Sequence, residues 1–141
     1  MNKIVIIGCG NVGMSYAYAL VNQRCNVDEL VLIDVNKEKA VGEAADLNHS
    51  IPYSPNNMTI KAGDYSDCKD ATIVMIAAGA NQNVGETRLD LIHKNTAIFK
   101  DIISNVITSG FNKIFLIATN PVDALSYITY KYSKLPASKI I

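Results

Sequence analysis

The fold of this chain is decided by the stretch KIVIIGCGNVG, residues 3–13, which joins an apolar strand to a glycine-rich turn. Each of its three glycines has a separate task in a dinucleotide-binding turn. Gly8 permits the tight strand-to-helix turn, Gly10 lets the backbone approach a pyrophosphate, and Gly13 lets the helix pack close to the strand. The helix that follows would present free N–H groups and a positive dipole end. The stretch therefore predicts a pyrophosphate site.

An acidic residue at the end of the next apolar strand completes this signature. Residues 30–33 form that strand, and Asp34 follows it, about 20 residues beyond Gly13. A carboxylate there can accept hydrogen bonds from an adenosine ribose, and its charge would repel a 2′-phosphate. We therefore expect NAD rather than NADP. The glycines alone are a weak signal, whereas the glycines, both strands and the terminal acid together are specific.

Strands and helices alternate along the whole chain. The apolar runs predict strands at residues 4–7, 30–33, 58–62, 71–78 and 113–118, and the start of a sixth at 139–141. Helical spacing predicts helices at residues 11–24, 37–48, 86–109 and 123–133. This alternation indicates an α/β fold, a Rossmann doubly wound parallel sheet with helices on both faces. The ligand crevice should lie at the C-terminal ends of the strands.

Length and composition limit the class of protein. The chain of 141 residues suits one domain, residues 1–141, and 49% of it is hydrophobic, enough for a sizeable core. Lysine plus arginine number 13, as do aspartate plus glutamate, so the zero net charge argues against a nucleic-acid partner. We expect no membrane span and no metal site. Three cysteines without a CxxC pair suit a reduced, cytoplasmic protein.

Two later segments resemble one family closely. The stretch AAGANQNVGETRLDL, residues 77–91, resembles the active-site loop of L-lactate dehydrogenases. The stretch ATNPVD, residues 118–123, resembles the turn after that family's fifth strand, and residues 63–71 resemble the segment before its fourth. The resemblance runs from residue 3 to residue 141 without a gap. The loop is specific to the lactate/malate dehydrogenase group.

The resemblance implies a role for each matching position. Lys39 and Tyr65 match positions near the adenosine end of the cofactor, and Arg88 matches the arginine that polarises the substrate's keto oxygen. Asn120 and Asp123 match substrate positions, and Gln82 matches the position that faces the substrate's variable side chain. The implied cofactor-binding residues are Gly8, Gly10, Asn11, Val12, Gly13, Asp34, Lys39, Tyr65, Ala78, Gly79, Ala80, Ala118, Thr119 and Asn120.

Physical chemistry agrees with the roles of the loop. Reduction of pyruvate develops negative charge on its carbonyl oxygen, and the Arg88 guanidinium on a closing loop can stabilise that charge and exclude water. A neutral Gln82 suits the methyl group of pyruvate, whereas an arginine there would pair with the second carboxylate of oxaloacetate. Asn83-Val84 stands where the family often has Lys-Pro, which should loosen the start of the loop.

The family places its catalytic histidine in a second half, and neither His49 nor His93 is expected to replace it. We therefore expect the NAD-binding domain of an L-lactate dehydrogenase, inactive alone, from a homo-oligomeric enzyme of the tetrameric type that acts on pyruvate and L-lactate. Two alternatives stay open. One is the cofactor domain of a malate dehydrogenase, against which Gln82 argues. The other is a non-catalytic NAD-binding or redox-sensing module, which would leave the Arg88 loop unexplained.

Overall fold

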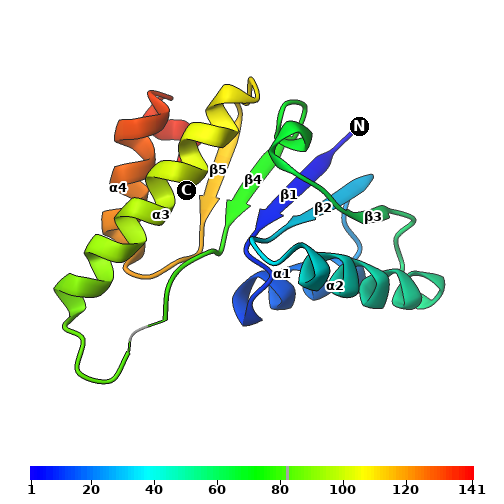
Figure 1. Ribbon diagram of the computed structural model, residues 1–141. Helices are drawn as coiled ribbons and strands as arrows, with labels where there is room; N and C mark the ends of the chain where they lie inside the picture. Colours follow the sequence, from blue (N-terminus) through cyan, green and yellow to red (C-terminus); the bar gives the residue numbers. More distant parts are fainter. Residues whose placement is uncertain (82) are drawn as a thin grey trace.

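The computed structural model describes residues 1–81 and 83–141, and a five-stranded parallel sheet forms its centre (Figure 1). The strands lie in the order β3-β2-β1-β4-β5. Their bounds are β1 Lys3–Ile7, β2 Glu29–Ile33, β3 Thr59–Ala62, β4 Ile73–Ile76 and β5 Ile114–Ile117. The winding reverses beside β1, which pairs with β2 on one side and β4 on the other. In such sheets ligands bind at the carboxyl ends beside this reversal.

Two pairs of helices cover the two faces of the sheet (Figure 1). Their bounds are α1 Asn11–Asn22, α2 Lys37–Ser50, α3 Arg88–Thr108 and α4 Val122–Ser133. Alternate residues of β1 point to opposite faces: Ile4 and Ile6 pack toward α1 and α2, whereas Val5 and Ile7 pack toward α3 and α4. Because both faces are covered, the strands are apolar almost throughout. The predicted doubly wound α/β fold is confirmed.

The prediction of a sixth strand at residues 139–141 is only partly right. Residues Ala137–Lys139 form a 3-10 helix instead, and a single parallel bridge joins Ile140 to Phe115. The Ile141 N–H donates to the Phe115 carbonyl at 3.0 Å, and the Ile141 carbonyl accepts from Ile117 N–H at 2.8 Å. The strand expected beside β5 is therefore reduced to a single bridge at Ile140. The strand expected at 71–78 is also shorter, because only Ile73–Ile76 lies within the ladder.

Candidate cofactor and substrate site

The glycine turn after β1 leaves open space at Gly10. A Cβ at Gly8, whose φ is +105°, would lie 2.7 Å from the Ala78 Cα, so only glycine fits there. A Cβ at Gly13 would overlap the Gly8 carbonyl. At Gly10, by contrast, an added Cβ would meet no atom within 4 Å. Packing does not require glycine at that position, which fits a backbone that must admit a phosphate group.

The N-terminus of α1 faces this turn without a side-chain cap. Gly10 is its N-cap residue and makes no side-chain hydrogen bond, and the first turn carries no acidic residue. The helices α2 and α3 differ, because Asn36 and Thr87 cap them through their side chains. The first N–H groups of α1 therefore lack a side-chain acceptor, and the positive end of its dipole suits an anion.

Asp34 is held in place at the end of β2 by two backbone groups. Its Oδ2 accepts from the Cys9 N–H at 2.8 Å, and its Oδ1 accepts from the Asn36 N–H at 2.9 Å. Each carboxylate oxygen can still accept a further hydrogen bond. Lys39 is exposed on the first turn of α2, and its charge lowers the pKa of the Cys9 thiol slightly against the larger effect of burial. Asp34, expected to bind the adenosine ribose, thus contacts the glycine turn directly.

The ends of β4 and β5 are joined through Thr119, which is 8% exposed. Its hydroxyl donates to the Ala78 carbonyl at 2.8 Å, and a Cβ added to Gly79 would lie 2.7 Å from its methyl group. The Ala118 N–H donates to the Ile76 carbonyl at 3.0 Å, which continues the pairing of β5 with β4. The cofactor positions predicted at these two strand ends therefore lie side by side.

A buried side chain that the sequence analysis missed joins the same two loops. Asn95 of α3 is 1% exposed, its Oδ1 accepts from Ala80 N–H at 2.8 Å, and its Nδ2 donates to the Asn120 carbonyl at 3.2 Å. One signal could have revealed it. Asn95 lies between Leu91 and Phe99 at four-residue spacing, so it is a polar residue on the apolar side of a helix.

Arg88 and Asn120 share one hollow at this edge of the sheet. The hollow is about 410 Å³ and is lined by Arg88, Leu91, Asn120 and Pro121. Arg88 is the first residue of α3, whose N-terminus is fixed by Thr87 and Asp90, each hydrogen-bonded to the backbone of the other. The structure thus brings together two residues that the sequence predicts to contact substrate. Of the other two predicted substrate residues, Asp123 does not line this hollow and Gln82 lies outside the described residues.

The start of the loop that carries Arg88 is held by hydrogen bonds. Asn83 donates through its backbone N–H to Glu86 Oε2 at 2.9 Å and through Nδ2 to Glu86 Oε1 at 3.2 Å. Lys94 of α3 pairs with the same Glu86 carboxylate. These bonds, first among them the one from the Asn83 backbone, lower the pKa of Glu86. Asn83 therefore supplies local contacts where the resembling family often has Lys-Pro.

The remaining predicted residues do not line the hollow that Arg88 and Asn120 share. Tyr65 is half-buried in the 3-10 helix Tyr65–Cys68 and packs against the core beneath α3, and burial raises the pKa of its hydroxyl. Asn11 and Val12 are exposed in the first turn of α1, and Asp123 is exposed in the first turn of α4. The structure does not bring His49 or His93 into the hollow between Arg88 and Asn120.

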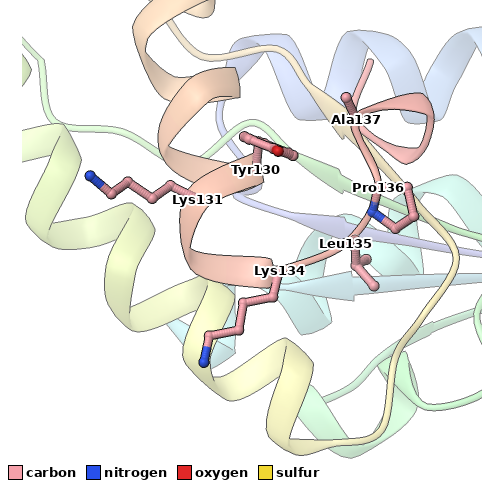
Figure 2. Close-up of a pocket in the computed structure, with 6 residues that line it drawn as sticks. All are labelled: Tyr130, Lys131, Lys134, Leu135, Pro136 and Ala137. Atoms are coloured by element: carbon pink, nitrogen blue, oxygen red, sulfur yellow. The ribbon is translucent and has the colours of Figure 1, made fainter.

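A second hollow, of about 460 Å³, lies at the far end of α4 (Figure 2). Tyr130, Leu135, Pro136 and Ala137 contribute to its wall, and the side chains of its two lysines point outward from α4 in Figure 2. Because α4 begins next to Asn120 and runs back along the sheet, this hollow is at the opposite end of the helix from the site. None of the residues predicted to bind cofactor or substrate lines it.

Two of the cysteines, Cys9 and Cys68, are buried. Burial, aided by the charges of Asp34 and Glu43, raises the pKa of Cys9 to about 11, and burial raises that of Cys68 to about 12. Within residues 1–81 and 83–141, no group of three His, Cys, Asp or Glu side chains is arranged to hold a metal ion. The helices in that part of the chain are each too short or too polar to cross a membrane.

Comparisons with known proteins agree on one family. The family described as lactate/malate dehydrogenase, NAD binding domain, matches residues 2–141. The L-lactate dehydrogenase of Halalkalibacterium halodurans is 61% identical over 140 residues, which cover 99% of this chain and 45% of that protein. The L-lactate dehydrogenase of a Geobacillus species is 59% identical over 141 residues, which cover 100% of this chain and 44% of that protein.

A solved structure gives the same result. The minor L-lactate dehydrogenase of Enterococcus mundtii, in its ligands-bound form, superposes with a TM-score of 0.96 at 49% identity, over 99% of this chain and 44% of that one. The chain therefore spans less than half the length of the relatives it matches.

Proposed function

Because this chain belongs to the lactate/malate dehydrogenase family, through that family's NAD-binding domain, we propose that it carries the cofactor of an enzyme that interconverts pyruvate and L-lactate. One observation carries the proposal. Arg88 and Asn120 line the same hollow, at the carboxyl edge of the sheet where the glycine turn also lies. A group that stabilises negative charge is therefore placed beside the loops that the cofactor is proposed to contact.

The first βα turn is proposed to hold the pyrophosphate. The open space beyond Gly10 admits a phosphate group, and the uncapped N–H groups at Asn11, Val12 and Gly13 can donate to it. Asp34 is proposed to accept hydrogen bonds from the adenosine ribose, with Lys39 and Tyr65 near the adenosine end. A 2′-phosphate would bring a second negative charge against Asp34, so NAD is favoured over NADP.

The residues after β4 and β5 are proposed to line the nicotinamide side. Ala78, Gly79, Ala80, Ala118 and Thr119 form this wall, which the Thr119 hydroxyl ties together. When bound, NADH supplies the hydride that reduces the keto carbon of pyruvate. Arg88 is proposed to stabilise the negative charge that develops on the keto oxygen, while Asn120 and Asp123 orient the substrate. Gln82 is proposed to face the methyl group.

Two other readings are weaker. A malate dehydrogenase would need a cation for the second carboxylate of its substrate, and Gln82 is neutral. A non-catalytic NAD-binding or redox-sensing module would have no use for Arg88, which lines one hollow with Asn120. The resemblance further supports a homo-oligomer of the tetrameric kind. The cysteine content supports a location in the cytoplasm.

The test is a steady-state assay of the purified full-length protein. Pyruvate and oxaloacetate are each offered with NADH and with NADPH, and oxidation of the reduced cofactor is followed by its absorbance. We expect kcat/KM to be highest for pyruvate with NADH. A preference for oxaloacetate would assign the protein to the malate branch, and NADH binding without turnover of either keto acid would favour the non-catalytic module.

A further inference from the structure

We infer that Asn95 is a positioning residue for hydride transfer, because its buried carboxamide fixes the two loops of the cofactor and substrate site to the helix that carries Arg88. The inference rests on the function proposed above. Asn95 is not itself proposed to contact the cofactor or the substrate. It acts through Ala80, Asn120 and Arg88.

The contacts of Asn95 use both ends of its side-chain amide. The carbonyl oxygen accepts from Ala80 N–H at 2.8 Å, in the segment after β4, and the amino group donates to the Asn120 carbonyl at 3.2 Å, in the segment after β5. The side chain is 1% exposed, so water does not replace either bond. A buried amide with both partners satisfied fixes one relative position of the groups it joins.

The placement of Asn95 on α3 links these loops to Arg88. The two residues are seven positions apart, which is close to two helical turns or about 10 Å, so they lie on the same side of the helix. Leu91 lies between them on that side and lines the hollow with Arg88 and Asn120. A shift of the Asn95 bonds would therefore move the Asn120 loop relative to the guanidinium.

Few side chains can replace this amide. Leucine and aspartate have nearly the same shape as asparagine, but leucine offers neither donor nor acceptor, and aspartate offers only acceptors when ionised. Asn95→Leu removes both bonds, whereas Asn95→Asp keeps an acceptor for Ala80 N–H and loses the donor to Asn120. Comparing the two variants thus distinguishes the effect of losing both hydrogen bonds from the effect of losing only the bond to Asn120.

The experiment compares these variants in the full-length protein. We expect Asn95→Leu to lower kcat by roughly 10- to 100-fold, since a misplaced catalytic group costs rate rather than binding. The KM for pyruvate and the Kd for NADH should change by less than about threefold, because the groups that bind are still present. Asn95→Asp should also lower kcat by about tenfold or more, through the lost Asn120 bond. Circular dichroism confirms that each variant is folded at the assay temperature.

Asn105 supplies matched controls on the same helix. Its Nδ2 donates to the Asp101 carbonyl within α3, at 2.9 Å, so Asn105→Leu and Asn105→Asp should leave kcat within about twofold of the parent. A kcat within twofold of the parent in either folded Asn95 variant would overturn the inference, as would a loss of NADH affinity as large as the loss of kcat.

A second readout does not need turnover. Saturating NADH is added to each protein, and the emission of the bound cofactor reports the surroundings of the nicotinamide. Both Asn95 variants should lose the change in emission that binding to the parent causes, and both Asn105 variants should retain it. If the parent fails to reduce pyruvate, the proposed function fails, but this measurement still decides the inference, because emission unchanged in the Asn95 variants would overturn it.

Discussion

The Asp34 carboxylate accepts a hydrogen bond from the Cys9 N–H at 2.8 Å, and this contact ties the end of β2 to the glycine turn after β1. The acid proposed to choose the cofactor therefore also helps to position the turn proposed to hold its pyrophosphate. The two tasks can be separated by experiment, because only the first depends on which cofactor is offered.

Replacing Asp34 by serine should narrow the gap in affinity between NAD and NADP. Serine removes the charge that repels a 2′-phosphate and weakens the bonds to the ribose, so the difference in binding free energy should shrink by roughly 1–2 kcal/mol. Calorimetric titration of both cofactors measures it. If the substitution also distorts the glycine turn, the binding of both cofactors should weaken alike, and the ratio of their affinities should not change for that reason.

The control is Asp46→Ser, which removes the same charge from an exposed position on α2. It should leave the ratio of the two affinities at the parent value. An equal NAD-to-NADP ratio in Asp34→Ser and the parent would mean that Asp34 does not contact the ribose.

Replacing Arg88 by glutamine should lower kcat much more than it raises KM. The guanidinium is proposed to stabilise charge that is present only in the transition state, and loss of one such donor costs on the order of 10²–10³ in kcat. Steady-state kinetics of the full-length protein with pyruvate measure both constants. Lys100→Gln, which removes a cation farther along α3 that lies over the Tyr132 ring, should leave kcat within about twofold. If Arg88→Gln raised KM alone, Arg88 would serve substrate binding only.

The ion pair between Asp70 and Lys3 should make stability depend on pH in acid. The Lys3 Nζ lies 2.7 Å from Asp70 Oδ1, and this hydrogen bond lowers the pKa of Asp70 below its usual value. A lowered carboxyl pKa stabilises the fold above the unfolded pKa, about 3.9, and that contribution disappears as the pH falls through the folded pKa. Asp70→Asn should therefore be less stable than the parent at pH 7, by under about 1 kcal/mol because Asp70 is largely exposed.

Urea unfolding at several pH values between 7 and 2.5 tests this expectation. The curves of free energy of unfolding should converge as the pH falls, since the parent then loses the contribution that the variant never had. A difference in the free energy of unfolding between parent and variant that stays constant over this pH range would show that folding does not change the pKa of Asp70.

The sequence predicted the site best where backbone geometry demands one residue type. Gly8 and Gly13 have no room for a Cβ, and a Cβ at Gly10 would meet no atom within 4 Å, so the three glycines match the turn once the two strands and Asp34 supply its context. The strands could be predicted because both faces of the sheet are covered and most strand residues are apolar. Their ends were less certain, since Ile140 pairs through one bridge where an apolar run predicted a strand.

The parts that were missed depend on contacts between segments far apart in the chain. Asn95 binds Ala80 and Asn120, which are 15 and 25 positions away, and no local pattern specifies those partners. Asn83-Val84 in place of Lys-Pro is expected to loosen the start of the loop, and the bonds from Asn83 to Glu86 were not foreseen because they depend on a turn that the sequence did not define. The sequence alone predicted neither the partial burial of Tyr65 nor its packing against the core beneath α3.

The assignment to the lactate branch depends most on Gln82, which can be tested by its replacement with arginine in the full-length protein. The new cation would pair with the second carboxylate of oxaloacetate, whereas with pyruvate it would stay unpaired next to a methyl group, which is costly. Preference should swing toward oxaloacetate by on the order of a thousandfold in the ratio of the two kcat/KM values, or about 4 kcal/mol. Steady-state kinetics on both keto acids measure the ratio. An unchanged ratio would mean that Gln82 does not face the substrate, and the choice of lactate over malate would then lack its basis in this residue.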